Sequence, residues 1–468
     1  MDTKWQPSLK DHPGPKYKAL ADTLKDGIRV GALPAGSKLP PVRDLAWKLS
    51  ITPGTVARAY TILTDAGICE ATVGRGTFVA NLPTAPEPDP MAINGVPHGS
   101  GGLTPDIRLL SPALPNMGQA ELIRELMRRV AQDPPSGLMH YPSREGFRPA
   151  RESIVEWLSG APIGALSEED VVLCHGGQNG ISLALQTILT GHRPVILVEE
   201  LAYPGFRRAA ERLRAEVIPV PMDEDGIIPE ALEEEAQKHG AQALCTSCEV
   251  HNPTAIFTPE SRRREIAAIA ERHDFQILED DCYRMGPSQA PTYRMLAPRR
   301  GWYVSSISKT LTPALRIGFT IAPQQQGAGL RRAAENGFFG LATPLGDLTT
   351  LLLRDPRTRM IAEKVRAEIE RHVKCMVSHL GERDLTWRED VPIAWLKLPT
   401  GWRAGSFCQA AAERSIKIRP AEEFACRDAR VPHAVRIAIN AQLPFERFEG
   451  AMATLRDLLD NPPERIGV

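Results

Sequence analysis

The first eighty residues carry apolar positions at a spacing that predicts three short helices and a hairpin. The expected elements are helices over 14–31, 42–49 and 53–64 and strands over 68–73 and 77–80. Thr52 followed by Pro53 is typical of a helix start, because the hydroxyl caps a free amide and proline needs no amide proton there. Two short helices joined by a tight turn, with a hairpin behind them, indicate a winged helix-turn-helix.

From about residue 104 onward, apolar strand-like runs alternate with amphipathic helical patterns. Buried strands are expected over 171–174, 194–199, 216–219, 243–247 and 276–278, with helices between them. This alternation predicts a mostly parallel sheet with helices on both faces. The last hundred or so residues predict a smaller α+β part, with helices over 360–380 and 444–459 and strands over 393–397 and 434–439.

The chain is therefore expected to have a small N-terminal domain of a DNA-binding fold, called the head, followed by an α/β domain, called the body. We predict a winged helix-turn-helix domain over 1–80, a linker over 81–103 and a body over 104–468. The linker is predicted because it is rich in proline and glycine and has no periodic apolar pattern. Within the body we expect a large part over 104–350 and a small C-terminal part over 351–468.

Charge and cysteine content narrow the class of protein. The formal net charge of −1 over 468 residues argues against a protein that coats nucleic acid with its whole surface. The first eighty residues hold eleven Lys and Arg against seven Asp and Glu, so any nucleic-acid site should be local to them. The chain shows neither a signal sequence nor an apolar run long enough to span a bilayer, and we expect a cytoplasmic protein with no membrane partner. The eight scattered cysteines predict reduced thiols, and Cys245 and Cys248 lack the second pair of a metal site.

Hydroxyl, glycine and cationic side chains gather around the second helix of the pair. Hydroxyls and cations at a helix N-terminus suit phosphate oxygens, and the small Gly54 lets that helix enter the major groove. The residues expected to contact DNA are Lys38, Arg43, Thr52, Gly54, Thr55, Arg58, Arg75 and Gly76. An ordinary helical pair with a hairpin is the plainer alternative, and the placement of these polar residues favours DNA binding.

Residues 17–79 also resemble the GntR family of bacterial regulators. The matching residues include Leu39-Pro40, Arg43, Thr52, Thr55-Val56, Ala59-Tyr60, Leu63 and Gly74-Arg75-Gly76-Thr77. The resemblance implies double-stranded operator DNA as a partner. Two residues depart from the family pattern: Pro41 stands where a small residue is usual, and Pro53 stands where an arginine is common, so Arg58 is expected to contribute instead.

The chemistry of the body centres on one lysine, Lys309, within the stretch 305–319. A lysine among small hydroxyl residues can form an imine with an aldehyde, and a neighbouring arginine can hold a phosphate. A Gly-Gly-Gln run follows the first body strand and opens a helix, so its backbone amides are expected to bind an anion. The expected phosphate ligands are Gly176, Gly177, Gln178, Ser306, Ser308 and Arg316.

Four further side chains suit a planar aldehyde cofactor. Tyr203 can stack on a ring, and Asp280 can keep a pyridine nitrogen protonated. Asn252 and Tyr283 can donate hydrogen bonds to a ring phenolate. Each has a plain alternative as a cap, turn or core residue, yet all follow strand ends or begin helices, where open α/β sheets bind ligands. Pyridoxal 5'-phosphate is the predicted cofactor.

Residues 104–460 look like the fold-type-I aminotransferases. The matching residues are Tyr141, Gly146, Gly177-Gln178, Tyr203-Pro204-Gly205, Asn252-Pro253-Thr254, Asp280, Tyr283, Ser306, Ser308, Lys309, Arg316 and Gly318. Arg436 matches the arginine that takes the substrate carboxylate in such enzymes. With the head, the whole chain resembles the MocR subfamily of transcription factors. That resemblance implies a homodimer with swapped heads, the cofactor held as an internal aldimine on Lys309, and an amine or amino-acid effector.

Two functions stay open at this level. The leading one is a regulator whose effector forms an external aldimine at Lys309 and so biases the arrangement of the two heads. The alternative is a working aminotransferase with an accessory DNA-binding head, because the catalytic set is intact. The head favours the regulator. Ala255 stands where the aminotransferase family more often has glycine, and residues 337–344 are expected to line the effector mouth.

Overall fold

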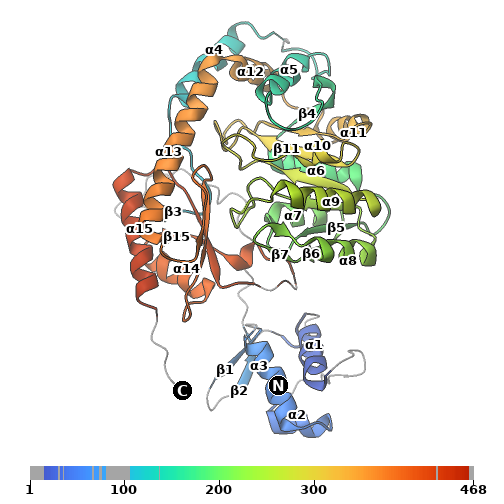
Figure 1. Cartoon of the computed structure of the whole chain (residues 1–468), viewed down its shortest axis with the longest axis vertical. Coiled ribbons are helices and arrows are strands. Elements are labelled where there is room, and N and C mark those ends of the chain that lie inside the picture. The colour runs from blue at the N-terminus through green and yellow to red at the C-terminus, as the bar shows by residue number, and fades with distance from the viewer. Residues whose placement is uncertain are drawn as a thin grey trace. The chain divides into compact units, whose positions relative to one another are not determined.

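The computed structural model separates into two compact units, described here as a head (residues 15–80) and a body (residues 106–462) (Figure 1). The residues that the structure describes are 15–29, 32–34, 36–65, 68–72, 76–80, 106–135, 138–427, 429 and 431–462. The predicted linker, 81–103, lies outside them. Of the helices within these ranges, none is both long and apolar enough to cross a membrane.

The head is built as its apolar pattern predicts. Its elements are α1 (Lys16–Arg29), α2 (Val42–Lys48), α3 (Pro53–Asp65), β1 (Cys69–Thr72) and β2 (Gly76–Val79). The two strands pair antiparallel, with Thr72 opposite Gly76. Val56, Tyr60 and Leu63 of α3 are buried, as expected from their spacing, and they pack against Leu20 and Leu24 of α1 in one core.

The two helix starts of the helix-turn-helix differ in their caps. Thr52 Oγ1 accepts a hydrogen bond from the Thr55 amide at 3.3 Å, which confirms the predicted cap of α3. Pro41 precedes α2 and its side chain makes no capping hydrogen bond. The departure from the family pattern at this position therefore leaves α2 without the stabilisation of about 1 kcal/mol that a serine or threonine cap gives.

The large part of the body contains a seven-stranded sheet in the order β4-β12-β11-β10-β9-β5-β6. Its strands are β4 (Val171–Cys174), β5 (Val195–Glu199), β6 (Glu216–Val220), β9 (Ala243–Thr246), β10 (Gln276–Asp280), β11 (Gly301–Ser306) and β12 (Gly318–Ile321). The run from β11 to β6 is parallel, whereas β12 is antiparallel to both its neighbours. A mostly parallel sheet is thus confirmed. The short hairpin β7 (Met222–Asp223) and β8 (Gly226–Ile227) follows β6.

Helices cover both faces of this sheet (Figure 1). They are α4 (Gln119–Gln132), α5 (Arg148–Trp157), α6 (Gly177–Ile188), α7 (Pro204–Arg212), α8 (Pro229–His239), α9 (Glu260–Arg272), α10 (Tyr293–Leu296), α11 (Gly327–Phe338) and α12 (Thr343–Arg354). Alternate residues of the strands point to opposite faces, so Ile196 and Val198 of β5 pack with α6, α7 and α11, whereas Leu197 packs with α8 and α9. This double cover explains why the strands read as continuous apolar runs.

The small part joins the large part through the long helix α13 (Pro356–Leu380) (Figure 1). Its other elements are β13 (Leu385–Thr386), β14 (Ile393–Lys397), α14 (Ala404–Glu413), β15 (Ile416–Lys417), β16 (Arg419–Pro420), β17 (Ala434–Ala438) and α15 (Phe445–Asp460). β13, β14, β17 and β16 form an antiparallel sheet in that order.

The start of the body belongs with the small part, which corrects the predicted division at residue 350. β3 (Ile107–Arg108) pairs parallel with β15, and Ala113 bridges to Asn440. Leu109 is buried in the small part's own core, among residues of α13, α14 and α15. Pairing of segments about three hundred residues apart leaves no periodic signal near residue 107, so the pattern alone could not reveal it.

Candidate functional site

The predicted cofactor residues meet at one edge of the seven-stranded sheet. Ser306 at the end of β11 lies opposite Gly318 of β12, and Gly318 lies opposite Cys174 at the end of β4. The helix α6 begins at Gly177, directly after β4, and Asp280 ends β10. Because parallel strands end at a common edge, this register brings the starts of α6 and β12 beside the Ser306–Lys309 turn.

Gly176 and Arg316 form a close-fitting cup at this edge. Gly176 has φ +78°, and a Cβ built on it would lie 2.5 Å from Arg316 Nη2, so the guanidinium occupies the space that a side chain would need. Arg316 itself has φ +51°, a left-handed conformation that non-glycine residues rarely adopt. Ser308 Oγ is buried and has no hydrogen-bond partner in the structure. The N-terminus of α6, a cation and a free hydroxyl thus converge, which is the donor set that a phosphate needs.

We expect Gly176→Ala to weaken binding of the cofactor phosphate far more than the same glycine-to-alanine change at Gly191. The methyl group displaces the Arg316 guanidinium, so affinity for pyridoxal phosphate should fall at least tenfold, measured by fluorescence titration. Gly191→Ala is the matched control, since Gly191 has φ +82° with nothing within 4 Å of an added Cβ. Both variants place a side chain at positive φ and should each lose about 1–3 kcal/mol of folding free energy from backbone strain, with the larger loss at Gly176, where the methyl group also meets Arg316. Equal cofactor affinities in the two variants would contradict the cup.

The two neighbouring aspartates after β10 have different partners. Asp281 is buried and accepts hydrogen bonds from Arg284 Nε at 2.6 Å and from the Tyr303 hydroxyl at 2.5 Å. Asp280 accepts the Cys282 amide at 3.1 Å and also interacts with the Cys282 thiol, and no cation is among the partners recorded for it in the described residues. Burial raises the pKa of Asp280 to about 6, because no cation lies close enough to offset the lost hydration. Asp280 is therefore the carboxylate available to a cationic ring nitrogen.

We expect Asp280→Asn to stabilise the cofactor-free protein while it weakens cofactor binding. The folded state binds the Asp280 proton more tightly than the unfolded chain does, so this group's contribution to stability is full below about pH 4 and is lost as pH rises through about 6. Asparagine avoids that loss and should raise the unfolding free energy at pH 7 by about 1–3 kcal/mol. The gain should vanish below about pH 4 in urea titrations. A gain that is independent of pH would contradict this origin.

Lys309 lies in the turn after β11, with its Nζ 5.4 Å from the centroid of the Tyr283 ring. Tyr203 caps the start of α7, and its ring meets Phe206 edge-on at 5.9 Å. Burial raises the pKa of the Tyr203 phenol, so it stays protonated. Gln178 donates its side-chain amide to the Gly205 carbonyl at 3.0 Å, which ties the start of α6 to α7. We therefore expect the backbone amide of Gln178, rather than its side chain, to serve an anion.

Arg436 lies buried on β17 and contacts groups from four other segments. Its Nη1 donates to Asn252 Oδ1 at 2.6 Å, and its Nη2 donates to the Leu110 carbonyl at 2.5 Å. The guanidinium carbon lies 4.7 Å from the centroid of the Phe424 ring. Burial lowers the pKa of Arg436, and its contact with Tyr283 opposes that shift. The Nε group is buried without a hydrogen-bond partner, so the arginine still has a donor to offer.

Several features of this site were missed by reasoning from the sequence. No strand was predicted within 305–319, but this stretch starts in β11 and ends in β12. The Leu110 carbonyl and Phe424 were not predicted as partners of Arg436. Cys282 was also unassigned, and its Sγ lies 2.4 Å from where a Cβ on Gly177 would be. Gly177 is therefore needed for packing as well as for its amide.

Ala255, the departure from the family noted above, adopts φ +61° and is fully buried. A left-handed alanine explains why glycine is common at this place. Its amide donates to the His251 carbonyl at 2.7 Å, which closes the turn that carries Asn252. The turn thus keeps its geometry at the cost of some backbone strain.

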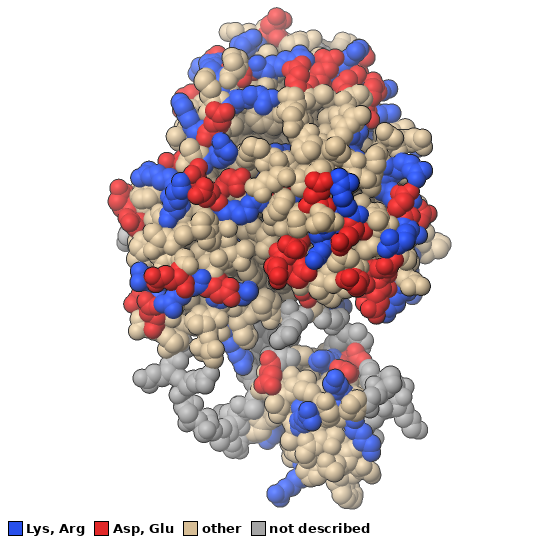
Figure 2. Space-filling model, in the orientation of Figure 1, with Lys and Arg blue, Asp and Glu red and all other residues tan. Residues whose placement is uncertain are grey.

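In the head, the residues predicted to contact DNA lie mostly on the exposed side of the helix pair. Arg43, Thr52, Gly54 and Arg58 are exposed, and Thr55 is half-buried. A Cβ added to Gly54 would meet Thr52 Oγ1 at 3.9 Å as its nearest neighbour, so the helix start is open. The face shown in Figure 2 carries separate Lys and Arg side chains on the head, with few acidic ones.

Two cations of the head have intramolecular aromatic partners. The Arg58 guanidinium lies 4.1 Å from the centroid of the Tyr17 ring, which holds it against α1. Lys38 Nζ lies 5.8 Å from the Phe78 ring, and its side chain covers Gly76. Arg75, predicted at the tip of the wing, lies outside the described residues.

A helix-turn-helix head on an aminotransferase-like body defines a two-part class of protein, and comparisons with known proteins agree. Residues 106–455 match the model of aminotransferase class I and II, and residues 16–79 match the bacterial regulatory proteins of the gntR family. The chain is 26% identical to the HTH-type transcriptional regulator YdeF of Bacillus subtilis, over 98% of this chain and 97% of that protein. It is 27% identical to the probable rhizopine catabolism regulatory protein MocR of Rhizobium meliloti, over 70% of this chain and 69% of that one.

The body also superposes on solved aminotransferases. Kynurenine aminotransferase of Pyrococcus horikoshii shares 19% identity with a TM-score of 0.69, covering 81% of this chain and 99% of that one. At this identity the likeness shows the fold alone. The chain belongs to the GntR-type regulators of the MocR kind, with a body of the aminotransferase class I and II family. It is thus a transcriptional regulator. GntR-type heads bind operator DNA. The enzyme family to which its body belongs depends on pyridoxal phosphate.

Proposed function

We propose that this regulator holds pyridoxal 5'-phosphate on Lys309 and senses an amine or amino acid there. The residues present fit the cofactor. Gly176, Gly177, Gln178, Ser306, Ser308 and Arg316 would hold its phosphate. Asp280 would pair with the ring nitrogen, Tyr203 would cover the ring, and Asn252 and Tyr283 would bind the phenolate. When bound, the cofactor supplies an aldehyde carbon that reacts with amines.

The support for a sensing role is the hydrogen bond from Arg436 to the Leu110 carbonyl. A carboxylate that binds its fork through Nε and Nη2 would compete with the Leu110 carbonyl for Nη2. Arg419 Nε also donates to the Leu110 carbonyl, at 2.8 Å, so that oxygen keeps a partner after displacement. Effector binding and the position of residue 110 are therefore linked by one shared guanidinium.

The segment held in this way is the first described stretch of the body after the predicted linker. The Leu109 amide donates to the Lys417 carbonyl, and the Leu109 carbonyl accepts from the Ala438 amide. The Arg108 carbonyl accepts from the Asn440 side chain at 3.0 Å. A change at Leu110 thus reaches the chain that leads to the head through covalent bonds and a short strand. Such a link would give the effector a different affinity for two positions of this segment, which any allosteric coupling requires. Arg436 is the single observation that carries the proposal.

For operator recognition we propose that the start of α3 and its surroundings contact the DNA. Thr52, Gly54 and Thr55 would lie at the groove, while Lys38, Arg43, Arg58, Arg75 and Gly76 would serve the phosphates. Arg43 is exposed, and Arg58 is exposed although it stacks on Tyr17.

We further propose a homodimer formed through the body. Large apolar side chains are exposed around residues 138–141, and Tyr141 is 84% and Phe339 70% exposed. Their rings lie 5.8 Å apart, so they form one continuous apolar surface. Water contact with such a surface is unfavourable, and a second body would cover it. Swapped heads are part of the same proposal.

An amine titration tests the sensing role. Full-length protein loaded with pyridoxal phosphate is titrated with single amino acids and simple amines, and both cofactor absorbance and affinity for DNA upstream of its own gene are measured. At least one amine should change the spectrum and shift operator affinity by roughly 5–150-fold. The idea would be falsified if amines alter the spectrum while operator affinity never moves.

The alternative, a working aminotransferase, is distinguished in the same experiment. Its supporting observation is that Lys309, Asp280, Asn252 and Arg436 are all present, with Arg436 bonded to Asn252 and Lys309 beside Tyr283. Steady formation of a new amino acid from an amino donor and a 2-oxo acid, over many turnovers, would favour the enzyme. Conversion that stops at one equivalent of cofactor would favour the sensor.

A further inference from the structure

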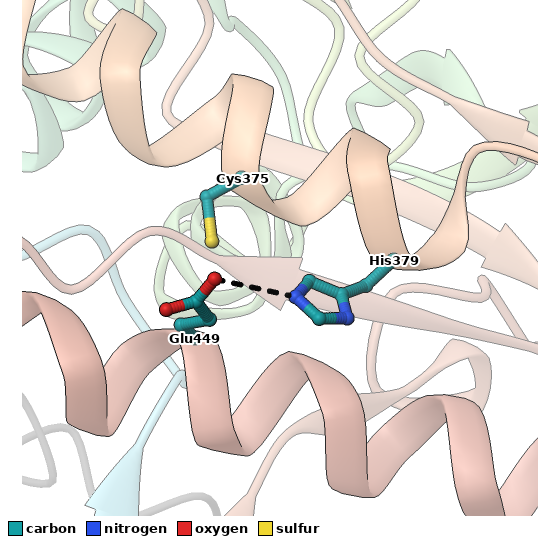
Figure 3. Close-up of side chains that lie close together, drawn as sticks. All are labelled: Cys375, His379 and Glu449. Carbon is teal, nitrogen blue, oxygen red and sulfur yellow. Dashed lines mark ion pairs between the residues drawn. The ribbon is translucent and has the colours of Figure 1, made fainter.

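A thiol, an imidazole and a carboxylate meet on the small part, away from the Lys309 site. Cys375 and His379 lie one turn apart on α13 and point toward Glu449 of α15 (Figure 3). Their potential ligand atoms all lie within 4.8 Å of one another. His379 Nε2 is 3.8 Å from Glu449 Oε1, which is too long for a hydrogen bond. Neither the cofactor site nor the DNA-binding head uses these three residues.

The two helices that carry this cluster are held rigidly together. Met376 and Leu380 of α13 pack against Phe448 and Met452 of α15 in the buried core of the small part. The backbones beneath the cluster are thus fixed, and only side-chain rotation is needed to adjust the ligand atoms. His379 lies in the last turn of α13, where the helix dipole favours a cation.

We propose that Cys375, His379 and Glu449 bind one divalent transition-metal ion of the zinc type. Sulfur and imidazole nitrogen select such ions over magnesium and calcium, which prefer all-oxygen sites. Tetrahedral zinc places its ligand atoms ~3.5 Å apart, so the cluster contracts by about 1 Å when it binds. Cys375 binds as the thiolate and releases its proton to water. The fourth position stays open to water.

The ion would tie the C-terminal helix to α13, the helix that joins the two parts of the body. His379 and Glu449 are partly exposed, with 22% and 52% of their side chains accessible, so an ion can enter from solvent. The buried Cys375 would anchor the ion from below. This site is independent of the effector proposal, because it shares no residue with the Lys309 site.

Cobalt titration of the untagged full-length protein, stripped with EDTA, tests this site. Cobalt should produce a thiolate-to-metal charge-transfer band that saturates at one equivalent and is abolished by zinc but not by magnesium. Cys375→Ser should remove the band, and His379→Gln and Glu449→Gln should each weaken binding at least tenfold. Cys408→Ser, which alters a half-buried thiol of α14, is the matched control and should leave the band unchanged.

Thermal unfolding gives a second readout. Zinc should raise the midpoint of the wild-type protein and of Cys408→Ser, and should leave that of His379→Gln nearly unmoved. His379→Gln and Glu449→Gln change partly exposed side chains, so they keep the test decisive even if Cys375→Ser folds poorly. No cobalt band in the wild type, or a band that survives in Cys375→Ser, would overturn the proposal.

Discussion

Lys309→Ala should abolish the proposed response of this regulator to an amine effector and leave operator binding nearly intact. The lysine Nζ is the nucleophile that would hold the cofactor, and alanine offers no replacement. An effector-induced shift of about 5–150-fold in operator affinity should shrink to within twofold. Operator affinity without effector should stay within about threefold, because the head has its own core and does not include this residue. Fluorescence anisotropy on the operator fragment measures both quantities.

The attachment itself can be followed by mass spectrometry. After borohydride reduction, wild-type protein should keep the cofactor covalently bound and the variant should not. Lys364→Ala, which removes an exposed lysine of α13, serves as control and should behave as wild type in both assays. If Lys309→Ala responded to the effector as the wild type does, the sensing site would have to lie elsewhere.

Arg436→Met should lower affinity for an amino-acid effector by about 2–5 kcal/mol, or roughly 30-fold to several-thousand-fold. The guanidinium is buried and offers an unpartnered Nε beside the Nη2 that holds Leu110. Methionine fills the space but cannot bind a carboxylate. Affinity for the corresponding decarboxylated amine should change little, because that ligand lacks the group that Arg436 recognises. Absorbance titration of the cofactor-loaded protein reports both.

Arg419→Met is the control that distinguishes loss of carboxylate recognition by Arg436 from loosening of the 106–113 segment. Arg419 also donates to the Leu110 carbonyl, but its other described partner is Glu423 rather than Asn252. The Arg419→Met variant should therefore change the effector-induced shift in operator affinity more than it changes the affinity for the amino acid. Equal losses of amino-acid affinity in the two variants would argue that Arg436 acts only through the segment.

Much of the fold follows from local pattern. Periodicity placed the helices of the head and most strands of the large part within a few residues, because a doubly covered strand is apolar throughout and an amphipathic helix repeats every 3.6 residues. β11 and β12 were not predicted, although Trp302-Tyr303-Val304 and Phe319-Thr320-Ile321 are short apolar runs of the same kind as the predicted strands. β3 was not predicted because a strand of two residues has no recognisable alternation of apolar and polar positions, and its partner β15 lies about three hundred residues away.

The sequence by itself determined the two-part organisation, the chemical identity of the cup residues and the lysine at its centre, since each is a property of short motifs. Only the tertiary structure showed that Asp281 is engaged, by Arg284 three residues on and by Tyr303 of the neighbouring strand β11, which leaves Asp280 as the available carboxylate. It also decided that Arg436 holds Leu110, and that Cys375, His379 and Glu449 meet. The contacts of Tyr303 with Asp281, Arg436 with Leu110, and Glu449 with the α13 pair join residues far apart in the chain, so packing of the whole body, rather than local preference, fixes them.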